Sequence, residues 1–172
     1  MAIVDRYNMR LIGPNCMGAM SLEADLNATI IGAGVPGHVA LVTQSGSIGA
    51  CMLDYVRDLG LGFSSIVSLG NQADVTVCDL LPFYEQDEHT RVIVLYLEMV
   101  LEPQRFCRLV SQKTKPVLAL KSGRTAAGMA AVSSHTGSQP ATTNSWTPCS
   151  TRPGSPGWTR WRNCFSAPKL CP

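Results

Sequence analysis

The sequence predicts an α/β fold, a doubly wound parallel sheet with helices on both faces. Two observations predict it. Short apolar segments alternate with helical segments between residues 1 and 138, and loops rich in Gly, Ser and Asn follow the apolar segments. With 45% apolar and 15% charged residues, a chain of 172 residues is long enough to bury the core of one domain.

The expected strands are short apolar runs that end at turn residues. They are Arg10–Gly13, His38–Thr43, Phe63–Ser68, Val92–Leu97 and Pro116–Leu120. The run Val92–Leu97 (VIVLYL) is continuous, which is typical of a strand buried on both faces. Helices are expected over Ile48–Leu59, over about residues 75–85, from Pro103 to about residue 112, and over Thr125–Ala131.

Charge and cysteine content exclude several classes of partner. A net charge of +2 is too small to predict binding to nucleic acid or to an acidic membrane surface. No apolar run reaches the roughly 18 residues of a membrane span, and no signal pattern opens the chain. Seven cysteines at irregular spacings, without a CxxC pair, predict reduced thiols rather than disulfides or a metal site. We therefore expect a cytoplasmic protein without a metal ion of its own.

The composition changes abruptly after Ser138. Residues 1–138 hold all twelve acidic residues, whereas residues 139–172 hold none but contain all three tryptophans. Disorder is one interpretation of this tail, although disordered segments are poor in tryptophan. A frameshift is the other: codons for residues 157–172 (GWTRWRNCFSAPKLCP) can be chosen that read VDTLEELFQRPEALS, a typical helix start, in a shifted frame. The chain is thus expected to comprise a native domain, 1–138, and an aberrant tail, 139–172.

The loop Ser45-Gly46-Ser47 leads from an expected strand directly into a helix. Free N–H groups and the positive end of the helix dipole form an anion site there, and Gly46 lets a phosphate approach the backbone. A plain N-cap serine is the alternative. Neither a Walker pattern nor GxGxxG is present, so this domain is not expected to hold a nucleotide by itself.

His135 lies among small hydroxyl and glycine residues in SSHTGS, just beyond the last helical segment. Its uncovered imidazole suits a histidine that accepts and passes on a phosphoryl group, and a histidine in a polar turn is the alternative. Glu98 ends the most hydrophobic strand. Its carboxylate either is solvated or accepts a hydrogen bond from one nitrogen of His135, which would leave the other nitrogen nucleophilic. A third candidate, Cys16 in the turn GPNCMG, has no neighbouring base and fits a small buried thiol better than a nucleophile.

Together, six segments resemble a known family in their order along the chain. They are GPNCMG at 13–18, ALVTQSGSIG at 40–49, VSLGNQAD at 67–74, LYLE at 95–98, LKSGRT at 120–125 and SSHTGS at 133–138. These segments are similar to those of the acyl-CoA synthetases (NDP-forming), a group that includes ADP-forming acetate–CoA ligase and is related to the succinyl-CoA synthetase alpha subunit.

The resemblance implies a flavodoxin-like domain and the reaction acyl-CoA + phosphate + ADP ⇌ carboxylate + CoA + ATP. It implies that His135 is the phosphohistidine, Glu98 its hydrogen-bonding partner and Ser45–Ser47 the helix start that meets the phosphate. It also places Asn15 and Cys16 near the thioester end of CoA and Asn71 near the acyl group.

Family members carry a CoA-binding Rossmann domain before the position of Tyr7, and an ATP-grasp domain, which holds the nucleotide and Mg2+, on the same or a partner chain. Neither is recognisable in this sequence, so we expect little turnover from this polypeptide alone. Two other functions stay open. One is a regulatory, non-catalytic module of a lysine acetyltransferase, and the other is a truncated product without function.

Overall fold

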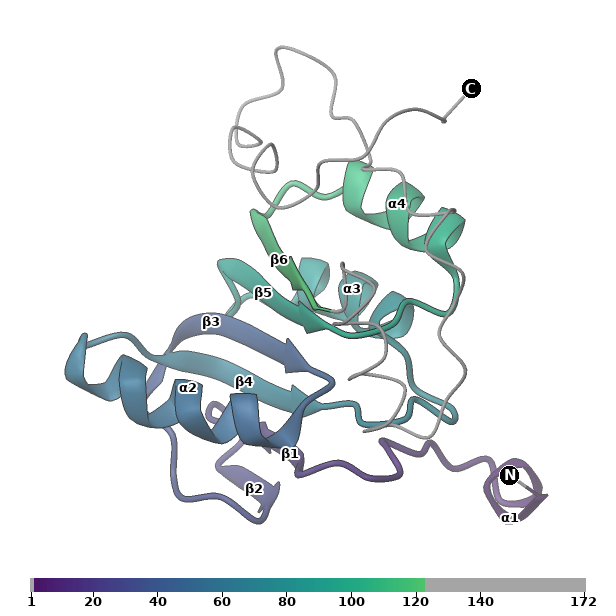
Figure 1. Ribbon diagram of the computed structural model, residues 1–172, viewed down its shortest axis with the longest axis horizontal. Helices are drawn as coiled ribbons and strands as arrows, with labels where there is room; N and C mark the ends of the chain where they lie inside the picture. The colour runs from purple at the N-terminus through teal and green to yellow at the C-terminus, as the bar shows by residue number, and fades with distance from the viewer. Residues whose placement is uncertain (1, 123–172) are drawn as a thin grey trace.

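The computed structural model describes residues 2–122, which form a six-stranded mixed sheet with helices packed on it (Figure 1). The elements are α1 (Ala2–Arg6), β1 (Gly18–Ser21), β2 (Leu26–Thr29), β3 (Pro36–Thr43), α2 (Gly46–Asp58), β4 (Phe63–Ser68), α3 (Val77–Gln86), β5 (Val92–Leu97), α4 (Pro103–Ser111) and β6 (Val117–Lys121). Thr125–Ala131, His135 and the tail 139–172 lie outside the described residues.

The sheet has the strand order β2-β1-β4-β3-β5-β6. Strands β3, β4, β5 and β6 are parallel to one another, and β1 pairs antiparallel with both β2 and β4. The chain leaves β3 toward β4 on one side and then returns to β5 and β6 on the other. This is the order of a doubly wound, flavodoxin-like sheet, whose topological switch point lies between β3 and β5. The predicted fold class is confirmed.

Each central strand contributes to two cores because successive side chains point to opposite faces of a sheet. Leu41 of β3 and Ile66 of β4 pack with Leu53 of α2 on one face. On the other face, a larger cluster joins the neighbouring strand residues, Val42 among them, to buried residues of α3 and α4 such as Phe106. Helices therefore cover both faces, as expected: α2 one face, α3 and α4 the other (Figure 1).

One predicted strand is wrong. Arg10–Gly13 is not part of the sheet. It lies instead along the loop after β4, where the Leu11 N–H donates to Asp74 Oδ2 at 2.7 Å and the Arg10 guanidinium forms an ion pair with the same carboxylate at 3.0 Å. The hairpin β1–β2 occupies the sheet position instead. Its sequences GAMS and LNAT lack the apolar, β-branched pattern by which the other strands were recognised.

One smaller expectation needs correction. Only one face of β5 is fully buried, because Val94 and Tyr96 are half-buried while the alternate residues are buried. Of the cysteines, Cys16, Cys51 and Cys78 are free thiols, as expected. Among residues 2–122, no helix is long and apolar enough to cross a membrane.

Candidate functional site

The predicted site residues that fall within residues 2–122 gather at one edge of the sheet. We call the edge where β3, β4, β5 and β6 end the carboxyl edge, and the edge where they begin the amino edge. The arrowheads of β3, β4 and β5 point toward the carboxyl edge at the right of Figure 1. Because β1 is antiparallel and Gly18 pairs with Ser68, the loop before β1 reaches the same edge. Ligands of doubly wound sheets bind beyond this edge.

The helix α2 begins at the switch point between β3 and β5. Ser45 is its N-cap and accepts a hydrogen bond from the Ile48 N–H on its side-chain oxygen at 3.5 Å. The Ser45 and Ser47 hydroxyls lie 3.1 Å apart, Ser45 buried and Ser47 exposed. The N–H groups of Gly46 and Ser47 belong to the first turn, where no earlier helical carbonyl can accept them. The predicted helix start is confirmed, and it presents the donors that an anion needs.

Gln44, immediately before this helix, connects it to Glu98. The Oε1 atom of Gln44 accepts hydrogen bonds from the N–H groups of Glu98 and Met99, both at 2.7 Å. The Nε2 atom of the same side chain donates to the Met99 carbonyl. Gln44 is only 7% exposed, so these bonds form away from water. The two halves of the predicted site, the helix start and the carboxylate, are thereby joined by one amide side chain.

Lys121, the last residue of β6, holds Glu98 from the other side. Its ammonium donates to the carbonyls of Glu98 and Ser122, both at 2.6 Å. Burial lowers the pKa of Lys121, and the charge of Glu98 opposes that shift. The side chain of Glu98 is half-buried, and within residues 2–122 its carboxylate accepts no hydrogen bond and forms no close ion pair. The carboxylate is therefore available to a further partner.

The loops that carry Asn15 and Asn71 lie against each other. The Asn15 side-chain amide donates to Asn71 Oδ1 at 3.3 Å, and the Asn71 N–H donates to the Pro14 carbonyl at 2.9 Å. Gly70 makes this approach possible: it has a φ of +52°, and a Cβ there would lie 2.2 Å from the Pro14 oxygen. Cys16 is half-buried, and its thiol donates to the Ile12 carbonyl at 3.5 Å.

The next residue, Met17, connects these loops to α2. A Cβ on Gly46 or on Gly49 would lie 2.7 Å from the Met17 side chain, so these two glycines make room for it. Beneath this turn, the buried Ser68 hydroxyl has no hydrogen-bond partner within the described part of the chain. A continuous row of contacts thus runs along the carboxyl edge, from Asn71 through the Asn15 loop and the start of α2 to Glu98 and Lys121.

Sequence reasoning missed Gln44 and Lys121. Both lie inside segments that carry the family resemblance, but neither was given a role, because their bonds to the Glu98 backbone join positions 54 and 23 residues apart. Their polarity at the ends of apolar strands is the signal that could have found them. His135, the proposed phosphoryl carrier, lies outside the described residues.

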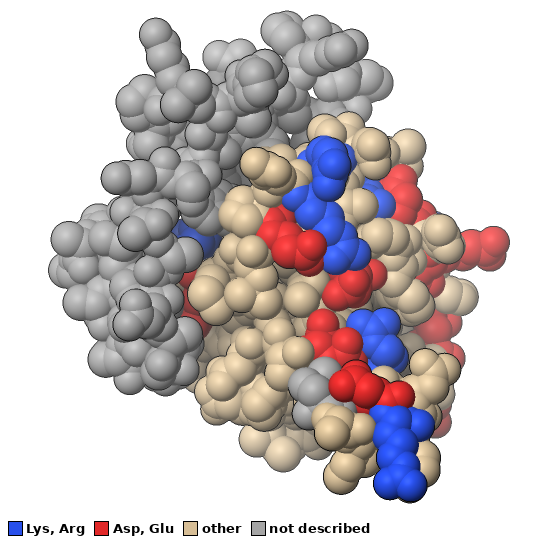
Figure 2. Space-filling model, turned by 90° about the vertical axis from the view of Figure 1, so that its right-hand side faces the viewer, with Lys and Arg blue, Asp and Glu red and all other residues tan. Residues whose placement is uncertain are grey.

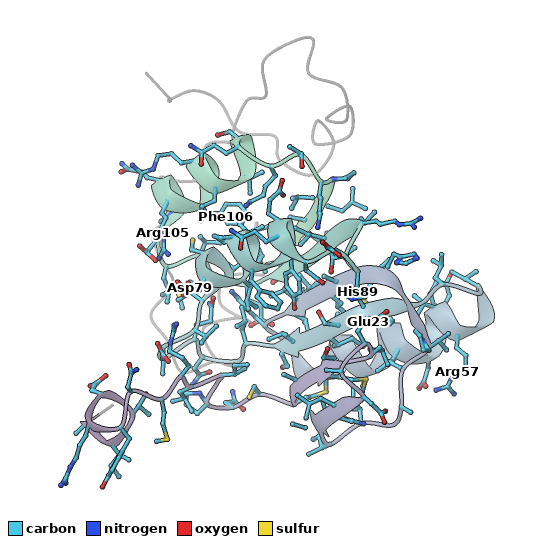
Figure 3. The ribbon with its side chains drawn as sticks, turned by 180° about the vertical axis from the view of Figure 1, so that it is seen from behind. Glu23, Arg57, Asp79, His89, Arg105 and Phe106 are labelled. Carbon is cyan, nitrogen blue, oxygen red and sulfur yellow. The ribbon has the colours of Figure 1, made fainter. Side chains whose placement is uncertain are left out.

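Charges elsewhere at this end of the molecule are paired. Arg105 of α4 bridges Asp79 of α3 and Glu102 at 3.0 and 2.8 Å, which ties the two helices together (Figure 3). The hydrogen bond from Arg10 lowers the pKa of Asp74, and the Leu11 N–H lowers it further. Figure 2 shows basic and acidic side chains next to one another rather than a patch of one sign. This surface is not built to attract a large polyanion.

A cavity of about 450 Å³ lies away from the carboxyl edge, between the β1–β2 hairpin and α3. Its wall is largely apolar, and the Glu23–His89 pair, 3.4 Å apart, stands on its amino-edge side (Figure 3). No residue of the predicted site lines it. Within residues 2–122, no group of three or more His, Cys, Asp or Glu side chains is placed to hold a metal ion.

Comparison with known proteins places this geometry in a family. The family model described as succinyl-CoA ligase like flavodoxin domain matches residues 36–166. The acetate–CoA ligase (ADP-forming) of Methanocaldococcus jannaschii is 46% identical over 79% of this chain and 20% of its own length. The alpha subunit of acetate–CoA ligase (ADP-forming) II of Pyrococcus furiosus is 41% identical over 79% of this chain and 30% of its own length.

A solved structure agrees. The dinucleotide-forming acetyl-coenzyme A synthetase 1 of Candidatus Korarchaeum cryptofilum, in complex with phosphate and ADP, superposes with a TM-score of 0.76 and 38% identity, over 82% of this chain and 32% of that one. The chain thus spans between a fifth and a third of these relatives. Its sequence, its sheet order and the family match agree: the chain belongs to the succinyl-CoA ligase like flavodoxin domain family.

Proposed function

We propose that this chain is the phosphohistidine-bearing domain of an ADP-forming acyl-CoA ligase. The observation that carries the proposal is the Gln44 bridge, which joins the start of α2 to the backbone of Glu98 at the switch point. An anion-binding helix start and an unpaired carboxylate are the two groups that a histidine needs when it accepts a phosphoryl group. The names of the relatives, which are ADP-forming CoA ligases, support the same reaction.

The proposed reaction has three balanced steps. Phosphate attacks the acyl carbon of the thioester, the C–S bond breaks, and CoA leaves as the thiolate. One imidazole nitrogen of His135 then attacks the phosphorus of the acyl phosphate, and the carboxylate leaves with the electrons of the P–O bond. Finally the phosphoryl group moves from His135 to ADP and forms ATP.

Each group at the carboxyl edge has a proposed role in these steps. The N–H groups at Ser45–Ser47 receive the phosphate oxygens. Glu98 accepts a hydrogen bond from the second imidazole nitrogen, which leaves the attacking nitrogen unprotonated and stabilises the cation that forms. Asn15 and Cys16 face the thioester end of CoA, and Asn71 the acyl group. The thiol of Cys16 donates to a backbone carbonyl, which suits a structural neighbour better than a nucleophile.

The other parts of the proposed ligase are carried elsewhere. We assign CoA to a Rossmann domain, and ADP with Mg2+ to an ATP-grasp domain, on the complete protein or on a partner chain. The relatives are three to five times longer than their matched segments, which leaves room for both domains. The bound phosphate and ADP reported for the Korarchaeum protein are consistent with this arrangement.

The proposal is tested by the phosphorylation of the chain. Purified protein is incubated with ³²P-labelled acetyl phosphate and assayed for acid-labile, base-stable label. We expect label on the wild-type chain and none on His135→Ala. Equal label on both proteins would reject His135 as the carrier. A wild-type chain without label would instead favour a regulatory module or a product without function.

We further propose that residues 139–172 result from a one-base loss near codon 139. The loss of all acidic residues and the shifted sequence VDTLEELFQRPEALS support it. The family model aligns through residue 166, past the proposed point of the loss, so we expect the restored frame to make residues 139–166 more similar to that model. Resequencing of the DNA around codon 139 is the decisive experiment, and an intact frame would remove the proposal.

A further inference from the structure

Every backbone hydrogen-bonding group of Glu98 is bound by a side chain from a neighbouring strand end. Its N–H donates to Gln44 Oε1 at 2.7 Å, and its carbonyl accepts from Lys121 Nζ at 2.6 Å. The flanking Met99 is bound on both its N–H and its carbonyl by the same Gln44 amide. Because β5 ends at Leu97, Glu98 itself lies beyond the strand. Side chains therefore take the place of the sheet ladder.

The two holding side chains are suited to this task. Gln44 is buried and uses both ends of its amide, a carbonyl that accepts twice and an NH₂ that donates. Lys121 uses its ammonium on two main-chain carbonyls and forms no close ion pair within the described residues. A half-buried cation bound to carbonyls is costly compared with an apolar side chain. Its presence at this position is more easily explained by the direction it gives to Glu98 than by stability.

We propose that Gln44 and Lys121 are positioning residues, which fix the backbone of Glu98 and with it the point and direction from which its free carboxylate extends. This inference rests on the proposed function, in which that carboxylate orients the imidazole of His135. Segments beyond strand ends are otherwise mobile, and a displacement of about 1 Å at a reacting group can lower a rate by about a hundredfold. The clamp, defined as Gln44 and Lys121 with their bonds to Glu98 and Met99, removes that freedom.

The structure contains a matched control for Lys121. Lys115, two residues before the same strand begins, also donates its ammonium to two main-chain carbonyls, those of Tyr84 and Asp87. Lys115→Met and Lys121→Met therefore remove the same kind of contact. Only Lys121→Met releases Glu98. Gln104→Leu, on the exposed side of α4, is the corresponding control for Gln44→Leu.

The first measurement is the rate of labelling of the 172-residue chain by acetyl phosphate. We expect Gln44→Leu and Lys121→Met to lower the maximal rate about tenfold to a hundredfold. The acetyl phosphate concentration at half-maximal rate should not change, because the side chains of the clamp are engaged with the main chain of Glu98, Met99 and Ser122. Lys121→Arg, which keeps a cationic donor, should recover most of the rate, and Lys115→Met and Gln104→Leu should stay within about twofold of wild type.

The second measurement does not depend on the reaction. Amide hydrogen exchange at Glu98 and Met99 should become about tenfold faster in Gln44→Leu and stay unchanged in Gln104→Leu, since only the first variant removes their acceptor. Unchanged exchange in Gln44→Leu would overturn the clamp even if the chain took up no phosphate, whereas absence of label on wild type would reject the proposed function. Equal rate losses in Lys115→Met and Lys121→Met would overturn the positioning role.

Discussion

The amino and carboxyl edges of the sheet carry similar polar side chains, but these side chains bind different partners at the two edges. At the amino edge, polar side chains form hydrogen bonds within the fold. The Ser64 and Thr90 hydroxyls lie 2.7 Å apart, and the Thr114 N–H and hydroxyl both donate to Glu85 Oε1. At the carboxyl edge, Gln44 and Lys121 bind main-chain groups of Glu98, Met99 and Ser122, and they leave the Glu98 carboxylate without a partner in the described part of the chain. The first pattern stabilises the fold, and the second leaves a carboxylate that the proposed function can use.

The contrast is sharpest for the two glutamates. Glu85 Oε1 accepts two hydrogen bonds, and only its Oε2 is without a partner. Both oxygens of Glu98 are without a partner in the described part of the chain, while its backbone is fully bound. A glutamate whose backbone is fixed and whose carboxylate has no partner is the arrangement expected of a binding site. Less binding energy is then needed to order the segment that carries the carboxylate. Variants matched across the two edges test this difference.

The largest effect, on the free energy of unfolding, should come from the substitution of a glycine at the carboxyl edge. Gly70 at the carboxyl edge and Gly60 at the amino edge both have positive φ, but a Cβ on Gly70 would meet the Pro14 and Asn15 oxygens at 2.2 and 2.4 Å, whereas one on Gly60 would meet nothing within 4 Å. We expect Gly70→Ala to lower the free energy of unfolding by about 3 kcal/mol and Gly60→Ala by about 1 kcal/mol. Urea denaturation measures both, and equal losses would mean that the Asn15 and Asn71 loops are not packed together.

The second effect is on phosphorylation. Glu98→Gln keeps the shape of the side chain but removes the charge that stabilises an imidazolium, so the rate of labelling of His135 should fall about tenfold or more. Glu85→Gln makes the same chemical change at the amino edge and should leave that rate within about twofold of wild type. If the two variants label at the same rate, the free carboxylate has no part in the transfer.

Some elements of the sheet could be predicted from the sequence and others could not. Strands β4 and β5 follow the predicted bounds because a bounded apolar run carries its own signal. The hairpin β1–β2 could not be found in this way, since GAMS and LNAT are small or polar and their place depends on pairing with β4. The segment at Arg10 has a strand-like composition, but its backbone and side chain bind Asp74 and it lies outside the sheet.

In the site, too, some residues could be predicted from local sequence patterns and others could not. Ser45 and Glu98 could be proposed from local patterns, a helix start and a charge at the end of an apolar strand. The roles of Gln44 and Lys121 depend on β3, β5 and β6 being neighbours in that order, which no local pattern determines. The contact between Asn15 and Asn71 likewise requires the antiparallel β1 to lie beside β4.

The third prediction concerns a buried hydroxyl near the amino edge. The Ser65 hydroxyl donates to Tyr84 Oη at 2.7 Å, and burial raises the pKa of Tyr84 to about 12, so the phenol stays neutral. Tyr84→Phe leaves Ser65 without its partner and should lower the free energy of unfolding by about 1–2 kcal/mol. Labelling of His135 should not change. A slower rate at unchanged stability would show that the two regions are coupled.

The smallest effect is a dependence of stability on pH at Glu85. Burial alone would raise the pKa of this carboxyl group, but the hydroxyl and N–H of Thr114 donate to it and hold the pKa below its ordinary value of 4.5. A depressed folded-state pKa contributes stability above the unfolded-state pKa, and this contribution is lost as the pH falls through the folded-state value. The difference in stability between wild type and Glu85→Gln should therefore be full at pH 7 and shrink below about pH 4.5 in urea denaturation at a series of pH values. A difference that grew on acidification would mean that burial, not Thr114, sets the state of this carboxylate.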